Sequence, residues 1–150
     1  MLQESFGVKQ AGTYYKDRIG IYGIGFNQDL EIPIIKTPTG YFLLGGGLEQ
    51  QESHGQCIQR ECLEEAGLSV AVGDFICKGD KYHWSDTLEY SMHAIGYFYF
   101  IHSIYKVSAP TELDHELLWL SYSECIDKLF LDHQAWAVKI AYQKAVRNIK

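Results

Sequence analysis

The sequence predicts a single α/β domain in which helices cover both faces of a mixed β-sheet. Length and composition support one core, because the chain has 150 residues and 47% of them are hydrophobic. No repeat, low-complexity segment or linker-like run interrupts residues 1–150, so one domain is expected to span them. Segments typical of strands and of helices also interleave without strict alternation, which favours a mixed sheet over a purely parallel one.

The first third of the chain predicts three strands separated by turns. Residues 18–27, RIGIYGIGFN, combine β-branched and aromatic residues with small glycines and predict a strand. A short polar turn leads into a second predicted strand, residues 30–36, in which Pro33 indicates an edge position or a bulge. After another turn, the predicted strand YFLL, residues 41–44, runs directly into three glycines.

The next segment changes to a helical period and predicts a helix over residues 53–66. Ser53 is followed three residues later by Gln56, which is the spacing of a capping box, and Gly67 suits the C-terminal cap. The apolar positions that repeat on one face are Cys57, Ile58 and Cys62. Small thiols pack well in a protein interior, so both cysteines are expected in the core.

The rest of the chain predicts three strands and two helices. Two long strands are expected over residues 68–80 and 87–103, joined by a loop around KYHWSD, residues 81–86. The segment LLWLS, residues 117–121, predicts a short last strand. Two closing helices with amphipathic spacing are predicted near residues 121–129 and 132–147.

Charge and cysteine usage exclude several classes of function. The formal net charge is −6, so no general attraction to a nucleic acid polymer is expected. The four cysteines form no CxxC pair and have no ligand-like spacing to histidine, which argues against a zinc site and a disulfide framework. The sequence has neither a secretion-signal pattern nor an apolar run of membrane-spanning length. A cytoplasmic protein without a membrane partner is therefore expected.

Negative charge is concentrated on one face of the helix predicted over residues 53–66. Side chains three and four residues apart share a helix face, and like charges at that spacing destabilise an isolated helix. The carboxylates gathered in and before this helix are those of Glu49, Glu52, Glu61, Glu64 and Glu65. Arg60 alone leaves a surplus of negative charge, and hard divalent cations such as Mg²⁺ take oxygen ligands of this kind. A divalent cation would also let an acidic protein bind a phosphorylated small molecule.

The spacing of these residues resembles the Nudix box of MutT-like Nudix hydrolases, over residues 46–68. Gly46 is followed after five residues by Glu52, and after seven more by RECLEEAGL, residues 60–68, so every fixed position is filled. The resemblance implies an α/β/α sandwich in which the box forms a loop–helix–loop motif. It also implies metal-dependent hydrolysis of a phosphoanhydride bond in a nucleoside diphosphate linked to another group, X.

The resemblance assigns roles to the residues of the box. It implies that Glu61, Glu64 and Glu65 bind Mg²⁺, for which Mn²⁺ can substitute, and leaves open which carboxylate acts as general base. Arg60 and Glu52 are implied to orient and balance that catalytic cluster. Gly46 and Gly47 are implied to line the substrate site, where they also allow the backbone to turn sharply. The ordinary alternatives are a solvated helix face, a surface salt bridge and a simple turn.

Fewer residues outside the box can be assigned. Many members of the family add an acidic residue from a late loop, and the segment ELDHELLWL offers Glu112 and Glu116 as candidates. A polar loop leading into a strand explains these two residues equally well. Three histidines receive no role, because a lone histidine is more often a surface or satisfied residue; they are His54, His83 and His93.

The substrate is the least determined part of the interpretation. Small size and the absence of added domains favour a housekeeping pyrophosphohydrolase of nucleoside triphosphates, including oxidised ones. A sensor that binds a nucleotide without cutting it is the main alternative, although intact Glu61, Glu64 and Glu65 argue against it. An isomerase of isoprenoid diphosphates with the same fold would need a catalytic cysteine and further ligands that the sequence does not reveal. The sequence does not decide between a monomer and a homodimer.

Overall fold

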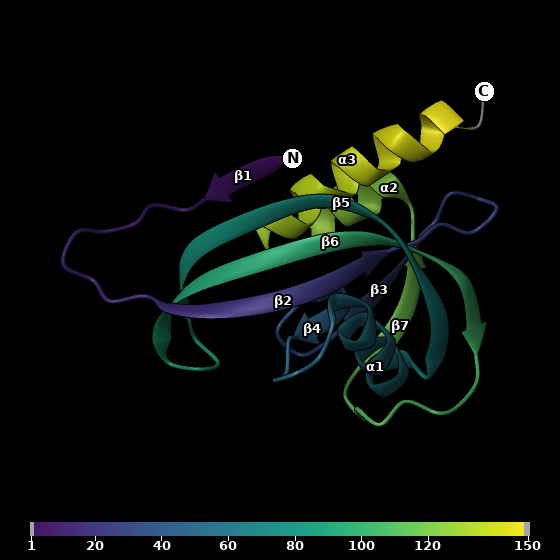
Figure 1. Cartoon of the computed structure of the whole chain (residues 1–150), viewed down its shortest axis with the longest axis horizontal. Helices are drawn as coiled ribbons and strands as arrows, with labels where there is room; N and C mark the ends of the chain where they lie inside the picture. The colour runs from purple at the N-terminus through teal and green to yellow at the C-terminus, as the bar shows by residue number, and fades with distance from the viewer. Residues whose placement is uncertain (1, 149–150) are drawn as a thin grey trace.

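A seven-stranded mixed sheet forms the centre of the protein, which a computed structural model describes for residues 2–148. The strands are β1 (Gln3–Phe6), β2 (Lys16–Ile24), β3 (Ile32–Lys36), β4 (Tyr41–Gly47), β5 (Leu68–Ser85), β6 (Tyr90–Lys106) and β7 (Glu116–Leu120). Their order across the sheet is β1-β5-β6-β2-β4-β3-β7. Helix α1 (His54–Ala66) lies on one side, and α2 (Tyr122–Lys128) and α3 (Asp132–Asn148) lie on the other (Figure 1). The predicted α/β/α sandwich is thereby confirmed.

Parallel and antiparallel pairing meet at β2. This strand pairs in parallel with β6 over Lys16–Ile24 and antiparallel with β4 over Gly20–Gly23. The β4 partners are its glycine-rich end, with Gly46 opposite Ile21 and Gly47 opposite Gly20. This pairing fixes the glycine-rich end of β4 inside the sheet, directly before the chain leaves for α1.

Helix α1 forms where capping and periodicity predict it. The Ser53 Oγ accepts a hydrogen bond from the Gln56 backbone N at 3.1 Å, and the Gln56 Oε1 accepts one from the Ser53 backbone N at 2.9 Å. Gly67 ends the helix in the left-handed region with φ 64°. The wholly buried Cys57, Ile58 and Cys62 pack with core residues of the sheet. Burial of this apolar face holds α1 on the sheet and confirms the two cysteines as core residues.

A second core lies between the sheet and the C-terminal helices. Ile24, Phe98 and Val138 are wholly buried there and pack in one cluster. Among residues 2–148, no helix is long and apolar enough to cross a membrane.

Two details of the predicted strands are wrong. The strand containing Pro33 is not an edge strand, since β3 lies between β4 and β7. Proline is tolerated because pairing with β4 covers only Ile34–Lys36, so no ladder hydrogen bond to β4 is needed at Pro33. The expected loop at 81–86 is instead almost wholly strand, since β5 continues to Ser85 and pairs with β6 to its end. The polar residues of this segment are typical of a loop, but its pairing with β6 makes it a strand.

Strand β1 was not expected from the sequence. Phe6 is the single large apolar residue of Gln3–Phe6, and the other three residues are polar and exposed. It is held by a parallel ladder with Lys78–Lys81 of β5 and by contact of the Phe6 ring with Trp136, at a centroid distance of 6.0 Å. Both partners are distant in sequence, so the local pattern carries no signal for this strand.

Candidate active site

The carboxylate of Glu61 occupies space that a side chain at Gly46 would fill. A methyl carbon added at Gly46 would lie 2.6 Å from both the Cδ and the Oε2 of Glu61, much closer than an ordinary contact. The same carbon at Gly47 would meet nothing nearer than the Nη2 of Arg18, at 3.6 Å. The glycine-rich end of β4 therefore forms a recess for one carboxylate of α1.

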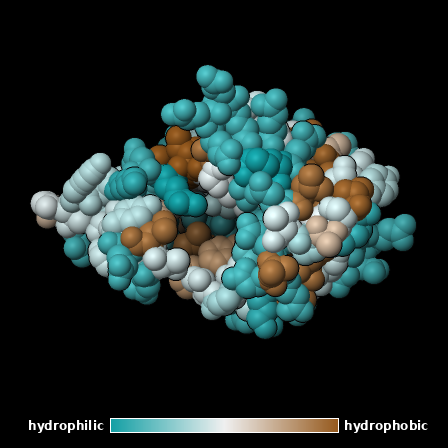
Figure 2. Space-filling view, turned by 90° about the horizontal axis from the view of Figure 1, so that it is seen from below, coloured by the Kyte–Doolittle hydropathy of each residue, from teal (hydrophilic) through white to brown (hydrophobic). Residues whose placement is uncertain are grey.

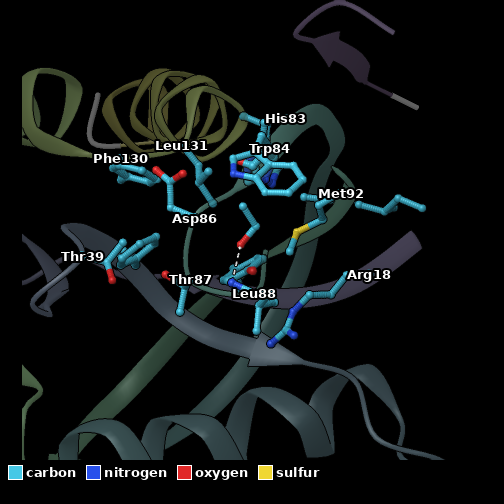
Figure 3. Close-up of a pocket in the computed structure, with 16 residues that line it drawn as sticks. Arg18, Thr39, His83, Trp84, Asp86, Thr87, Leu88, Met92, Phe130 and Leu131 are labelled. Atoms are coloured by element: carbon cyan, nitrogen blue, oxygen red, sulfur yellow. Dashed lines mark hydrogen bonds between the residues drawn. The ribbon is translucent and has the colours of Figure 1, made fainter. Parts of the chain in front are cut away.

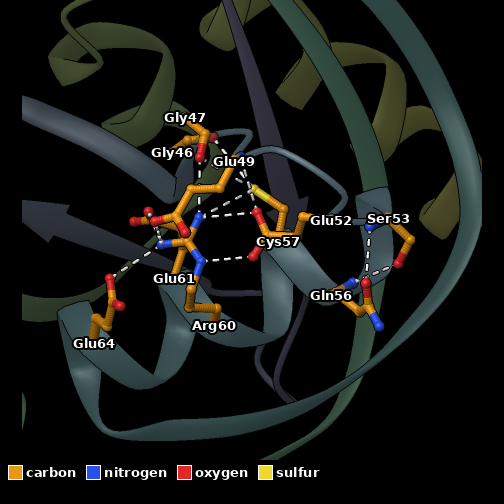
Figure 4. A network of polar contacts seen from close by, with 10 residues as sticks. All are labelled: Gly46, Gly47, Glu49, Glu52, Ser53, Gln56, Cys57, Arg60, Glu61 and Glu64. Atoms are coloured by element: carbon orange, nitrogen blue, oxygen red, sulfur yellow. Dashed lines mark hydrogen bonds and ion pairs between the residues drawn. The ribbon is translucent and has the colours of Figure 1, made fainter.

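The guanidinium of Arg60 links the carboxylates around α1 (Figure 4). Its Nε and Nη2 donate to the two oxygens of Glu52, at 2.6 and 3.0 Å, which is a bidentate pair. Its Nη1 donates to Glu61 at 2.8 Å and to Glu64 at 3.2 Å, and its Nη2 also donates to the carbonyl of Gly47 at 3.0 Å. These hydrogen bonds raise the pKa of Arg60, and the same pair lowers the pKa of Glu52 to about 2. Glu52 and Arg60 thus form a fixed ion pair that holds Glu61 and Glu64 on one side.

Glu65 is the most buried of the three predicted metal ligands. Only 8% of the residue is exposed, and its Oε1 accepts a hydrogen bond from the backbone N of Gly45 at 3.0 Å. Burial raises the pKa of Glu65 well above its ordinary value, and burial also raises that of Glu61. Repulsion from neighbouring carboxylates acts in the same direction, from Glu61 on Glu65 and from Glu64 on Glu61. The protein groups around Glu61 and Glu65 therefore do not fully compensate the negative charge of either carboxylate.

The loop before β7 brings further polar groups to the end of α1. The backbone nitrogens of Thr111 and Glu112 both donate to the carbonyl of Glu64, at 2.8 and 3.2 Å. The negative charge of Glu112 contributes to the raised pKa of Glu61 and of Glu65. Glu116 lies further along, on β7, opposite Lys36 of β3. The structure therefore brings Glu112 to the carboxylates of the box and places Glu116 in the sheet.

His115 lies beside the carboxylates of the box, and the sequence analysis did not single it out. Its Nδ1 lies 3.7 Å from the Oε2 of Glu65, and this buried nitrogen has no hydrogen-bond partner within residues 2–148. Ligand atoms of Glu112, Asp114 and His115 lie within 4.8 Å of one another. The segment ELDHELLWL contained all three residues, but only folding shows that the loop ends beside Glu65.

Comparison with known families shows to which family the chain belongs. The family model for the NUDIX domain matches residues 26–141, which is most of the sequence. The protein belongs to the Nudix family. Comparison with curated proteins finds no match.

Several solved Nudix structures share the fold. The E. coli ORF135 protein is 18% identical, with a TM-score of 0.67, over 91% of this chain and 94% of that chain. The MutT NUDIX hydrolase from Burkholderia pseudomallei is 23% identical, with a TM-score of 0.63, over 83% and 98%. A NUDIX hydrolase from Nitrosomonas europaea is 17% identical, with a TM-score of 0.65, over 86% and 90%. Family membership makes the protein a hydrolase of acid anhydrides in phosphorus-containing substrates.

The residues of the Nudix box suit the divalent cation that the family generally uses. Carboxylate oxygens are the ligands that a hard cation such as Mg²⁺ prefers. Glu61 and Glu65 have raised pKa values because burial and repulsion from neighbouring carboxylates outweigh the hydrogen bonds that they accept, so their negative charge is only partly compensated. The absence of a side chain at Gly46 leaves room for the Glu61 carboxylate. A bound cation would supply the missing positive charge, so the donor set fits.

A pocket of about 350 Å³ lies on the α3 side of the sheet (Figure 3). Arg18 and Tyr22 of β2 line it, and they also border the box. Arg18 lies near Gly47, and Tyr22 has its pKa raised to about 12 by burial and by the charges of Glu65 and Glu61. Seen from below, the surface of the molecule has a hollow bordered by hydrophobic and hydrophilic residues (Figure 2). Tyr22 therefore links the pocket to the charges of the Nudix carboxylates, which α1 holds on the opposite side of the sheet.

Proposed function

We propose that the protein is a housekeeping pyrophosphohydrolase of nucleoside triphosphates that requires Mg²⁺, with Mn²⁺ as a substitute. The observation that carries this proposal is the convergence of Glu61, Glu64 and Glu65, of which Glu61 and Glu64 share a single arginine that is already paired with Glu52. Such a surplus of carboxylates suits a cation that bridges protein and phosphate.

Some residues of the box would bind the cation, and others orient the residues that bind it. Glu61, Glu64 and Glu65 would hold the cation. Arg60 keeps Glu61 and Glu64 together, and its bidentate pair with Glu52 fixes the guanidinium. When bound, the cation would neutralise phosphate oxygens and lower the pKa of an attacking water. Ordered carboxylates need little rearrangement before reaction, which is the source of their catalytic advantage.

The pocket supports a nucleotide as substrate. Ligand pockets usually have about 300–1,000 Å³, so a volume of 350 Å³ is enough for a small organic group. Arg18 is exposed and stands between the pocket and Gly47, where its positive charge is placed for a phosphate. A nucleoside in the pocket would extend its first phosphate towards Arg18 and its further phosphates towards the carboxylates of the box.

The test is release of phosphate and pyrophosphate from a panel of substrates, with and without Mg²⁺ or Mn²⁺. The panel contains ordinary and oxidised nucleoside triphosphates, ADP-ribose, dinucleoside polyphosphates and nucleotide sugars. We expect metal-dependent turnover of a nucleoside triphosphate, and a fall of roughly 100-fold or more in Glu64→Gln and Glu65→Gln. Glu4→Gln is the matched control, because Glu4 is an exposed carboxylate of β1.

Two results would contradict the proposal. Nucleotide binding without turnover of any substrate would favour a sensor that uses the Nudix fold for recognition. Unchanged turnover in Glu64→Gln and Glu65→Gln would show that the carboxylates of α1 do not carry the reaction.

A further inference from the structure

Two opposed glycines make room for a buried histidine beside the pocket. Gly79 of β5 pairs with Gly96 of β6, and His133 of α3 packs on both. A methyl carbon at Gly79 would lie 3.2 Å from the His133 Cβ, and one at Gly96 would lie 3.0 Å from its Cδ2. His133 lines the pocket, is only 1% exposed, and has an Nδ1 without a hydrogen-bond partner within residues 2–148. Burial lowers its pKa to about 4, so the ring is neutral near pH 7.

A second histidine of the same pocket has a defined tautomer. The Nδ1 of His83 lies 3.2 Å from the carbonyl oxygen of Trp84. A carbonyl only accepts, so this nitrogen carries the proton. Burial lowers the pKa of His83 below its ordinary value, which leaves the ring neutral near pH 7. The Nε2 of His83 is therefore an acceptor, and it is buried without a partner in the described part of the chain.

Unpartnered buried nitrogens are unfavourable unless something pairs with them. Leaving a buried acceptor unsatisfied destabilises a protein, and native structures contain few such atoms. Two residues that carry such a nitrogen, His83 and His133, line one pocket here. Protein atoms cover the Nε2 of His83, so a ligand N–H group reaches and satisfies it once a neighbouring side chain moves aside. Asp86 also lines the pocket and adds a second acceptor for donor groups (Figure 3).

The rest of the lining suits a flat ring. The apolar and aromatic residues around the pocket include Tyr22, Phe42, Trp84, Leu88, Met92 and Phe130. Trp84 is 58% exposed and Leu88 is 44% exposed, so both leave apolar surface uncovered on the β5–β6 hairpin. Stacking on an indole and burial against aliphatic side chains both favour a planar heteroaromatic group. Arg18 marks the side of the pocket from which phosphates would extend.

We propose that this pocket binds the base of the substrate through an N–H donor directed at the Nε2 of His83, which makes His83 a specificity-determining residue. The inference rests on the proposed function for its choice of a nucleotide as ligand. Heteroaromatic rings with an amino group or a ring N–H are accepted, and rings without such a donor are disfavoured. His133 supplies the second polar contact, from the opposite element of the pocket.

Equilibrium binding to the metal-free protein in EDTA tests the inference without any turnover. The probes are three purine nucleoside monophosphates with the same sugar and phosphate. The adenine nucleotide carries an amino donor, the hypoxanthine nucleotide carries a ring N–H, and the unsubstituted purine nucleotide has neither. We expect the unsubstituted purine nucleotide to bind more weakly than the better of the other two, by roughly 10-fold or more.

Variants of His83 identify the acceptor. His83→Phe keeps a flat ring and removes the acceptor, so the preference for a donor should disappear. His83→Gln retains an amide oxygen that can accept, so part of the preference should return. His102→Phe is the control, since His102 is exposed on β6 and lies outside the pocket lining. It should keep the wild-type preference.

Three results would overturn the inference. They are equal affinity of the wild-type protein for all three nucleotides, no binding of any of them, and a preference that persists in His83→Phe. The wild-type comparison decides the matter even if a variant fails to fold. Hydrolysis assays with Mg²⁺ separate this inference from the proposed function. Donor-selective binding without turnover contradicts only the hydrolase proposal, and turnover without donor selectivity contradicts only the role of His83.

Discussion

Replacing Gly46 by alanine tests whether the recess in β4 positions the Glu61 carboxylate. The added carbon would lie 2.6 Å from the Glu61 Cδ, whereas an ordinary contact begins near 3.4 Å, so the carboxylate must move by about 0.8 Å. The moving group is the far end of a flexible side chain, and Gly46 does not have a positive φ. The fold should therefore tolerate the change, with a loss of about 1 kcal/mol or less in the free energy of unfolding.

The effect on catalysis should be much larger than the effect on stability. A misplacement of about 1 Å can reduce the rate roughly 100-fold, because a catalytic group then misses its productive geometry. We expect kcat/KM for metal-dependent hydrolysis to fall by about that factor in Gly46→Ala, with a higher Mg²⁺ concentration at half-maximal rate. Steady-state kinetics over a Mg²⁺ titration, together with urea unfolding, measure the two effects separately.

Gly47→Ala is the matched comparison for this prediction. Its added carbon would lie 3.6 Å from the nearest other group, an atom of Arg18, so Glu61 is not displaced. We expect the loss of activity in Gly47→Ala to be at least about tenfold smaller than in Gly46→Ala. Equal losses in the two variants would refute the reasoning, as would wild-type activity in Gly46→Ala.

Three further predictions concern the helix and its charges. Ser53→Ala removes the hydrogen bond from the Gln56 backbone N to the Ser53 Oγ and should lower the free energy of unfolding by ~1 kcal/mol in urea titrations; an unchanged midpoint would exclude a capping role for this side chain. Arg60 lowers the pKa of Glu52 to about 2, so the stability that Glu52 contributes should be present above about pH 4.5 and lost as the pH falls towards 2; acid unfolding of Glu52→Gln should lack this component. Glu61 and Glu65 have raised pKa values, so the unfolding free energy of the metal-free protein should fall as the pH rises above about 4.5. Added Mg²⁺ should then raise the melting temperature more at about pH 8 than at about pH 5, and an equal shift at both values would contradict this.

Local signals explain why much of the fold could be predicted. The bounds predicted for α1 agree with those found to within one residue, because Ser53, Gln56 and Gly67 act on backbone groups close to themselves in the chain. The strands around it have clear β-branched and aromatic patterns. The hairpin that includes residues 81–86 was misassigned because its polar side chains resemble a loop, and its hydrogen bonds come from a partner strand further along the chain.

The position of the late loop could not be predicted in the same way. Glu112 was a candidate only because the segment is acidic, and Glu116 was an equal candidate. In the structure, the backbone nitrogens of Thr111 and Glu112 donate to the carbonyl of Glu64. These hydrogen bonds place Glu112, and not Glu116, beside the carboxylates of the box. Contacts across nearly fifty residues leave no periodic trace in a sequence, which also explains why His115 was missed.

The family, the helix of the Nudix box and the cluster of carboxylates on one face of that helix could all be read from the residues alone. This was possible because the box is a contiguous segment whose spacing maps directly onto helix geometry. Folding was needed to show which groups lie opposite that face and which side chains line the pocket. His83 comes from β5 and His133 from α3, and both line one pocket, where Gly79 and Gly96 make room for His133. Such a site depends on strand pairing and helix packing between distant segments, so it exists only once the chain has folded.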